Sequence, residues 1–122
     1  MAIDFKEKFA ELKSKDTEPL TGFESGYVKI VENYIDYEIQ KKLSTDNIEV
    51  WIDVAYIRFN YNPETKKPFP TQMTNARKKV LENELLDRYE KANWKIKWHI
   101  DDGLDGPNMS GGDYLILKGK LN

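Results

Sequence analysis

The acidic, glycine-rich segment at residues 101–113 carries the side chains best suited to hold a metal ion. Asp101, Asp105 and Gly106 fall at the first, fifth and sixth positions of a calcium-binding loop, and Asp102 adds a further carboxylate. The twelfth position is Gly112, so the bidentate glutamate that such loops use is missing. Two interpretations stay open: a weak metal site that would serve a metal-dependent enzyme, and an exposed hairpin loop that uses Asp and Gly for its turns.

His99 is the only histidine of the chain. An imidazole acts as a general base when another side chain orients it, and Asp101 is the nearest candidate in the sequence. No serine stands in a nucleophile elbow, and the sequence contains no zinc-protease, P-loop or dinucleotide-binding motif. The sequence therefore assigns no catalytic residue and no cofactor, and it favours a protein that is not an enzyme.

A basic segment at residues 58–79 offers a different chemistry, the binding of nucleic acid. Its six candidate cations are Arg58, Lys66, Lys67, Arg77, Lys78 and Lys79. Together with Phe59, Tyr61 and Phe69 they could form a stacking groove for a single strand. The alternative is that these charges only solvate a loop and the start of a helix, although cations at a helix N-terminus oppose the helix dipole.

Three aromatic residues are candidate anchors for a protein partner. Trp51 alternates with apolar strand residues, which places it among the charged side chains of the opposite strand face. Tyr34 and Tyr37 widen the apolar surface of a predicted helix beyond one face, so that a second cover is needed, either the preceding helix or another subunit. Exposed aromatic residues with charged neighbours are typical of interface anchors.

The composition describes a small soluble protein. The chain has 122 residues, a net charge of −2 and no cysteine, which suits one domain and excludes disulfides and thiolate sites. No secretory signal precedes the first charged residues, and no apolar run approaches the ~20 residues that cross a bilayer. We expect a cytoplasmic protein with no membrane partner.

The spacing of apolar residues predicts the order α-α-β-α-β-β. Helices are expected at residues 4–14, from 21 or 25 to 43, and at 75–92, whereas strands are expected at residues 48–61, 94–100 and 113–118. The first helix is too short to be stable alone and should dock on its own domain or on a partner. Within the long strand the apolar phase changes near Ala55, which indicates a β-bulge or a change of covered face.

These elements predict a single α+β domain with a small mixed sheet and helices packed on one face. The β-α-β portion suggests a crossover that sets the first two strands parallel, and the last two strands should form an antiparallel hairpin. Trp94 and Trp98 are expected on the core face, against the third long helix.

The junction Glu90-Lys91-Ala92-Asn93-Trp94 joins a Lys- and Glu-rich helix to this hairpin. Over about the last 50 residues the chain resembles small bacteriophage-encoded proteins of uncharacterised role, in which glycine is commoner at the position of Asn93. The resemblance implies an accessory protein that binds a host or virion component. The sequence thus favours a protein-interaction module, with self-assembly as one form of it, and nucleic-acid binding and a metal-dependent enzyme as alternatives.

Overall fold

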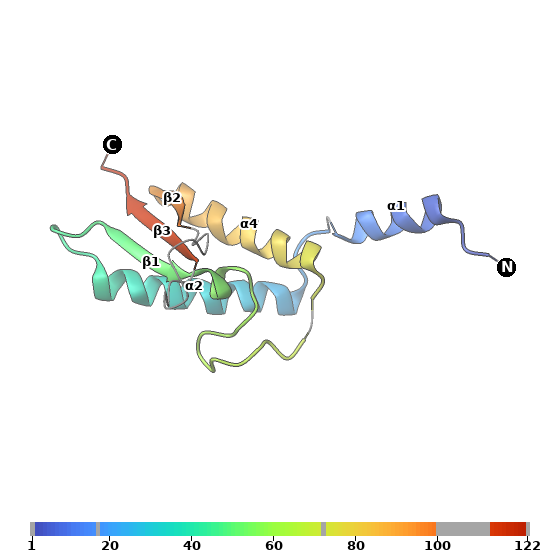
Figure 1. Cartoon of the computed structure of the whole chain (residues 1–122), viewed down its shortest axis with the longest axis horizontal. Coiled ribbons are helices and arrows are strands. Elements are labelled where there is room, and N and C mark those ends of the chain that lie inside the picture. The colour runs from blue at the N-terminus through green and yellow to red at the C-terminus, as the bar shows by residue number, and fades with distance from the viewer. Residues whose placement is uncertain (1, 17, 72, 100–112, 122) are drawn as a thin grey trace, which may run out of the picture.

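The computed structural model describes residues 2–16, 18–71, 73–99 and 113–121. Its elements, in chain order, are α1 (Phe5–Asp16), α2 (Gly22–Lys42), β1 (Glu49–Asp53), α3 (Val54–Ile57), α4 (Asn75–Lys91), β2 (Trp94–His99) and β3 (Tyr114–Gly119). Figure 1 shows the three strands beside two long helices, α2 and α4. The predicted single α+β domain is confirmed.

The sheet is antiparallel and has the order β1-β3-β2. The prediction of a mixed sheet is therefore wrong, although β1 and β2 run in the same direction, because β3 lies between them and pairs with both. The reason is visible in β3, where Leu115, Ile116 and Leu117 are all buried. A strand buried on both faces suits the middle of a sheet, whereas the lysines of β2 protect an exposed edge.

The predicted strand at residues 48–61 ends early, at Asp53. The Asp53 carboxylate accepts a hydrogen bond of 2.8 Å from the backbone N–H of Ala55, which caps the single helical turn α3. The change of apolar phase thus marks a helical turn, not a bulge. Behind this turn, Phe59 has a φ of 62° and its side chain is only 1% exposed.

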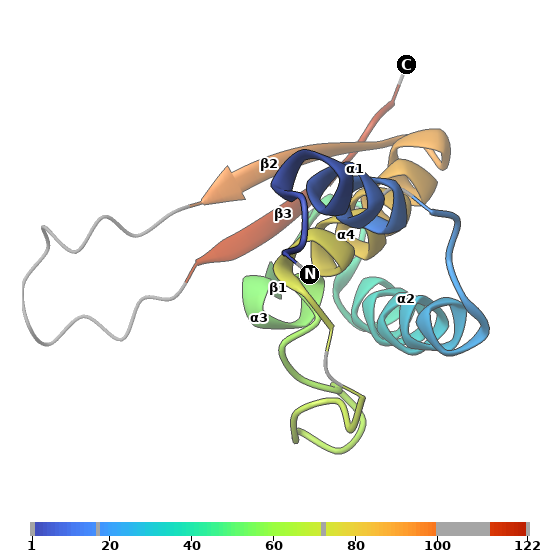
Figure 2. The same cartoon turned by 90° about the vertical axis from the view of Figure 1, so that its right-hand side faces the viewer.

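The core lies between one face of the sheet and the two long helices, which Figure 2 shows on the same side of the strands. Its fully buried side chains come from α2 (Val28, Val31, Ile35), α4 (Leu81, Leu85), β1 (Val50, Ile52), β3 (Leu115, Leu117) and the region of α3 (Ile57, Phe59). Side-chain caps begin both long helices: Glu24 Oε1 accepts from the Thr21 N–H at 2.9 Å, and Thr74 Oγ1 accepts from the Arg77 N–H.

The preceding helix α1, one of the two expected covers, does not cover the wide apolar surface of α2. Instead, the proline-containing loop and α3 supply the cover: Tyr27 stacks on Phe69 with ring centres 4.2 Å apart, and Tyr34 meets Tyr56 edge-on at 4.9 Å. The width of this helix surface therefore no longer argues for a second subunit.

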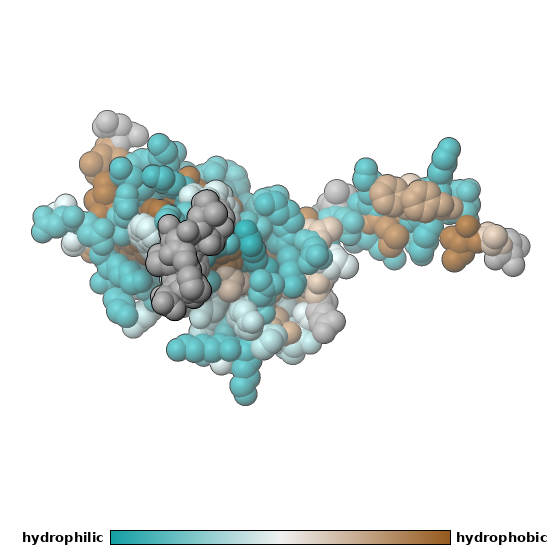
Figure 3. Space-filling model, viewed as in Figure 1, coloured by the Kyte–Doolittle hydropathy of each residue, from teal (hydrophilic) through white to brown (hydrophobic). Residues whose placement is uncertain are grey.

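Helix α1 extends away from the remainder of the structure (Figure 1), and none of its residues is buried. Its apolar side chains Phe5, Phe9 and Leu12 repeat at helical spacing and form one stripe, and Phe5 is 73% exposed. Figure 3 shows apolar surface in brown along this helix. Asp4 begins the helix as predicted, since its carboxylate accepts from the Glu7 N–H. In the structure, α1 does not pack along its length on its own domain.

Candidate functional site: an aromatic face on the sheet

Trp51, Tyr114 and His99 meet on the sheet face that points away from α2 and α4. The ring centre of Trp51 lies 5.1 Å from that of His99 and 5.6 Å from that of Tyr114. Trp51 keeps 41% of its surface exposed. We call these three residues the aromatic face; each comes from a different strand, so the fold of the whole sheet holds them together.

The pairing register explains this arrangement. Asp53 pairs with Tyr114 and Tyr114 with His99, so these three form one row across the sheet. In the next row Ile116 lies between Trp51 and Lys97. Because side chains alternate between faces along a strand, all of them point to the same side. Ile116 is buried although it lies on this side, which makes it the apolar floor beside Trp51.

The rim of the aromatic face carries both signs of charge. Glu49 and Asp53 lie along β1 at one edge, whereas Lys95 and Lys97 lie along β2 at the other, with Lys118 between. The face therefore has an acidic edge, an aromatic centre and a basic edge. This pattern suits a partner that itself carries separate positive and negative patches.

The three predicted anchors do not form one surface. Trp51 lies on the face opposite α2, whereas Tyr34 is half-buried against Tyr56. Burial, with a contribution from Glu38, raises the pKa of Tyr34 to about 12. Tyr37 is 60% exposed on α2. Of the predicted core tryptophans, Trp94 packs against the core, but Trp98 is partly exposed.

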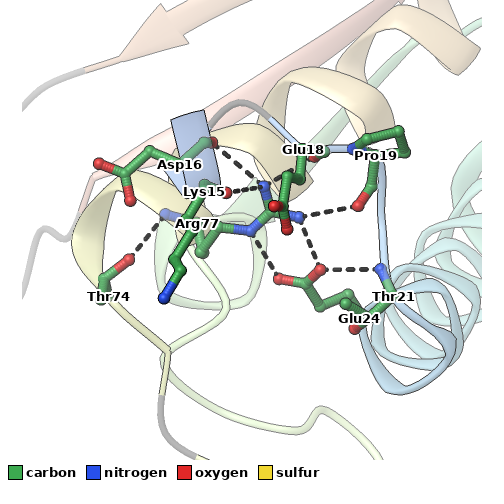
Figure 4. Close-up of polar contacts among 8 residues, drawn as sticks. All are labelled: Lys15, Asp16, Glu18, Pro19, Thr21, Glu24, Thr74 and Arg77. Atoms are coloured by element: carbon green, nitrogen blue, oxygen red, sulfur yellow. Dashed lines mark hydrogen bonds and ion pairs between the residues drawn. The ribbon is translucent and has the colours of Figure 1, made fainter. Parts of the chain in front are cut away.

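Arg77, one of the predicted nucleic-acid ligands, is an internal structural residue (Figure 4). Its Nε and Nη2 atoms donate to the two carboxylate oxygens of Glu24 at 2.9 and 2.6 Å. Other guanidinium N–H groups donate to carbonyl oxygens at the end of α1 and in the linker, those of Lys15, Asp16, Glu18 and Pro19, at 2.8–3.3 Å. Arg77 thereby joins α1, α2 and α4, and pairing with Glu24 raises its pKa.

The other five cations of the basic segment separate into two groups. Arg58, Lys78 and Lys79 line one hollow at the start of α4, whereas Lys66 and Lys67 lie in the loop closed by the Asn62–Lys67 bridge. The expected stacking groove does not form as predicted, because Phe59 and Phe69 are only 1% and 7% exposed. Tyr61 alone of the three aromatic candidates is exposed.

The predicted metal ligands Asp101, Asp102 and Asp105 lie outside the described residues. Among the residues that the structure does describe, no three carboxylate or imidazole side chains gather as a metal site. Within the same part of the chain, no helix is both long and apolar enough to cross a membrane.

The sequence predicted Trp51 as a partner anchor, but it did not predict that Tyr114 and His99 lie beside it. The alternation of β2 places His99 on the same face as Lys95 and Lys97. What was missing was the register, which no local pattern encodes. In comparisons with known proteins, no family model, no curated protein and no solved structure matches this chain. What the fold and the site define is a small α+β domain with one aromatic sheet face.

Proposed function

We propose that this protein is a non-enzymatic module that binds another protein through its aromatic face. The observation that carries the proposal is the cluster of Trp51, Tyr114 and His99 on a sheet face that α2 and α4 leave uncovered. Trp and Tyr give a large contact area with few rotatable bonds, and they dominate the binding free energy of protein interfaces.

The charge of the rim supports a protein partner over a nucleic acid. A polyanion favours a surface of one sign, because each phosphate contact needs a cation. Here Glu49 and Asp53 lie within the same face as Lys95 and Lys97. An aromatic centre inside a rim of both signs is instead the arrangement of a protein interface.

The experiment compares two exposed aromatic residues that lie on different surfaces. Tagged wild-type protein, Trp51→Ala and Tyr37→Ala are incubated with nuclease-treated lysate, and the retained proteins are identified by mass spectrometry. We expect one partner to be retained by the wild type and by Tyr37→Ala and to be lost by Trp51→Ala. With that partner purified, we expect Trp51→Ala to raise Kd by about 30-fold or more, as for a central anchor.

The stability of Trp51→Ala must be measured beside its binding. Because Trp51 is 41% exposed, we expect its replacement to change the free energy of unfolding by about 1 kcal/mol or less. Equal retention by Trp51→Ala and the wild type would refute the proposal. So would the retention of partners from untreated lysate and of none from the nuclease-treated lysate.

A second copy of the chain is one form that the partner can take. Light scattering during size exclusion decides this point: a species of 14.3 kDa across micromolar concentrations identifies the partner as a different protein. That this partner is a host or virion component stays a prediction, as do nucleic-acid binding by the basic segment and metal-dependent activity of residues 101–113.

A further inference from the structure

A hollow of about 250 Å³ lies between the end of α3 and the first turns of α4. We call it the cationic hollow; its lining residues are Arg58, Asn60, Asn75, Lys78, Lys79 and Glu82. It is separate from the aromatic face and shares no residue with it. Most of the charged residues in this lining are cations.

Three cations and one carboxylate line the cationic hollow, an excess of two positive charges. Lys79 Nζ lies 3.6 Å from Glu82 Oε2, a long ion pair. Lys78 Nζ donates instead to the neutral amide oxygen of Asn60, at 3.2 Å. Among the described residues, Arg58 has no carboxylate within ion-pair distance.

The position of these cations has an energetic cost that an anion would offset. Lys78 ends the first turn of α4 and Lys79 begins the second, near the positive end of the helix dipole, where a cation is disfavoured by up to a few tenths of a kcal/mol. Arg77 in the same turn is balanced by Glu24, whereas Lys78 has no such counter-charge in the described part of the chain. A doubly charged anion in the hollow would balance both the lysines and Arg58.

A second hollow, of about 260 Å³, adjoins the first, and its lining combines polar and apolar residues. Asn60 and Lys78 line both hollows, and the second is completed by Phe59, Pro68, Phe69, Thr71 and Met73. The left-handed backbone of Phe59, with a φ of 62°, turns the chain between them and places Asn60 beside Lys78. For an aromatic residue this conformation is rare and strained.

We propose that the cationic hollow binds the phosphate group of a small phosphorylated molecule whose carbon skeleton lies in the adjoining hollow. A phosphate monoester carries close to two negative charges, which matches the excess of the lining. Arg58 provides a planar fork for two phosphate oxygens, and Lys78 and Lys79 provide point charges. Two small hollows side by side have the size of a small-molecule site.

The test uses inorganic phosphate and phenyl phosphate as probes on the full chain. Thermal unfolding is followed with each probe and with sodium chloride at the same ionic strength. We expect both phosphates to raise Tm beyond the salt control, because a ligand of the native state stabilises it. Phenyl phosphate should bind more tightly, since its ring has a place in the adjoining hollow.

Two double variants with the same change of charge separate a site from general ionic attraction. Arg58→Gln with Lys79→Gln removes two exposed cations of the cationic hollow. Lys66→Gln with Lys67→Gln removes two exposed cations of the nearby loop. We expect the first pair to raise the Kd of phenyl phosphate about tenfold or more, and the second pair to leave it within about twofold.

Three results would overturn the proposal. The first is an equal rise of Tm in phosphate and chloride, and the second is an equal response of the two double variants to phenyl phosphate. The third is tight, strongly salt-dependent binding of a single-stranded oligonucleotide that both double variants weaken alike, because this would identify a general polyanion surface. A site for small phosphates predicts that the oligonucleotide does not compete with phenyl phosphate.

Discussion

Arg77 donates hydrogen bonds to both carboxylate oxygens of Glu24, which lies 53 residues earlier in the sequence. The distances are 2.9 Å from Nε and 2.6 Å from Nη2. The two side chains are only 13% and 3% exposed. The pair connects the first turn of α2 to the first turn of α4, and the same guanidinium holds the end of α1. Its removal should therefore affect the fold and not only the surface.

Replacing Arg77 by Ala should lower the free energy of unfolding by on the order of 3 kcal/mol, because it leaves a buried carboxylate without its counter-charge. Urea denaturation followed by circular dichroism measures this loss. The matched control is Arg88→Ala, whose ion pairs with Glu32 and Glu84 are more exposed and should contribute about 1 kcal/mol or less. Equal losses in the two variants would contradict the role given to Arg77.

The same pair makes the stability depend on acidity. The hydrogen bonds from Arg77 are the main reason that the pKa of Glu24 falls from 4.5 to about 2. A carboxyl group with a lowered folded-state pKa stabilises the protein fully above its unfolded pKa, and this contribution is lost as the pH falls through the folded value. The contribution of Glu24 should therefore decline between about pH 4.5 and pH 2.

The variant Glu24→Gln isolates this effect, since it cannot titrate. Its stability should lie furthest below that of the wild type above pH 4.5, and the difference should narrow toward pH 2. Urea titrations at half-unit pH steps provide the comparison. A difference that stays constant over this range would show that Glu24 titrates normally in the folded protein.

Asn93 occupies a left-handed conformation, with a φ of 71°, directly after the end of α4. Glycine is favoured at this position and asparagine is the usual substitute, because other residues are strained there. Asn93→Ala should therefore cost about 1 kcal/mol, whereas Asn93→Gly should be close to neutral. Thermal unfolding of both variants distinguishes backbone strain from loss of the asparagine side chain. Strain lowers the stability of Asn93→Ala alone, whereas loss of the side chain lowers the stability of both variants equally.

The exposed stripe of α1 should contribute little to stability. Replacing Phe5, Phe9 and Leu12 together by Gln should change the free energy of unfolding by no more than about 0.5 kcal/mol, because none of the three is buried. Leu85→Ala, in the core, should cost roughly 2–5 kcal/mol in the same assay. A large, concentration-dependent loss in the triple variant would mean that α1 packs against a second molecule.

The elements that sequence patterns predicted well are those with a clear period. Helices α2 and α4 and strands β2 and β3 lie within a few residues of their predicted bounds, because their apolar side chains repeat at 3.6 or 2 residues. Helix α3 was missed because four apolar residues, Val54–Ile57, fit a strand as well as one helical turn. The hydrogen bond from Ala55 N–H to the Asp53 carboxylate and the bond from Arg58 N–H to the Val54 carbonyl oxygen favour the helical turn.

The strand order and the site needed information that periodicity does not contain. Nothing local to Trp51 indicates that Tyr114 and His99 lie beside it, since that follows from two pairing registers. Likewise, no sequence pattern distinguishes the structural role of Arg77 from the exposed or partly exposed Lys78 and Lys79. The partner of Arg77 lies 53 residues away, and only the packing of α2 on α4 brings it near.

The middle position of β3 also sets an order of events during synthesis. A nascent chain that ends before Tyr114 contains β1 and β2 but lacks the strand to which both bind. Neither strand pairs with the other in the finished sheet, so no native part of the sheet can form early. The helices can begin to form on the ribosome, whereas native pairing of the sheet can begin only after β3 has emerged.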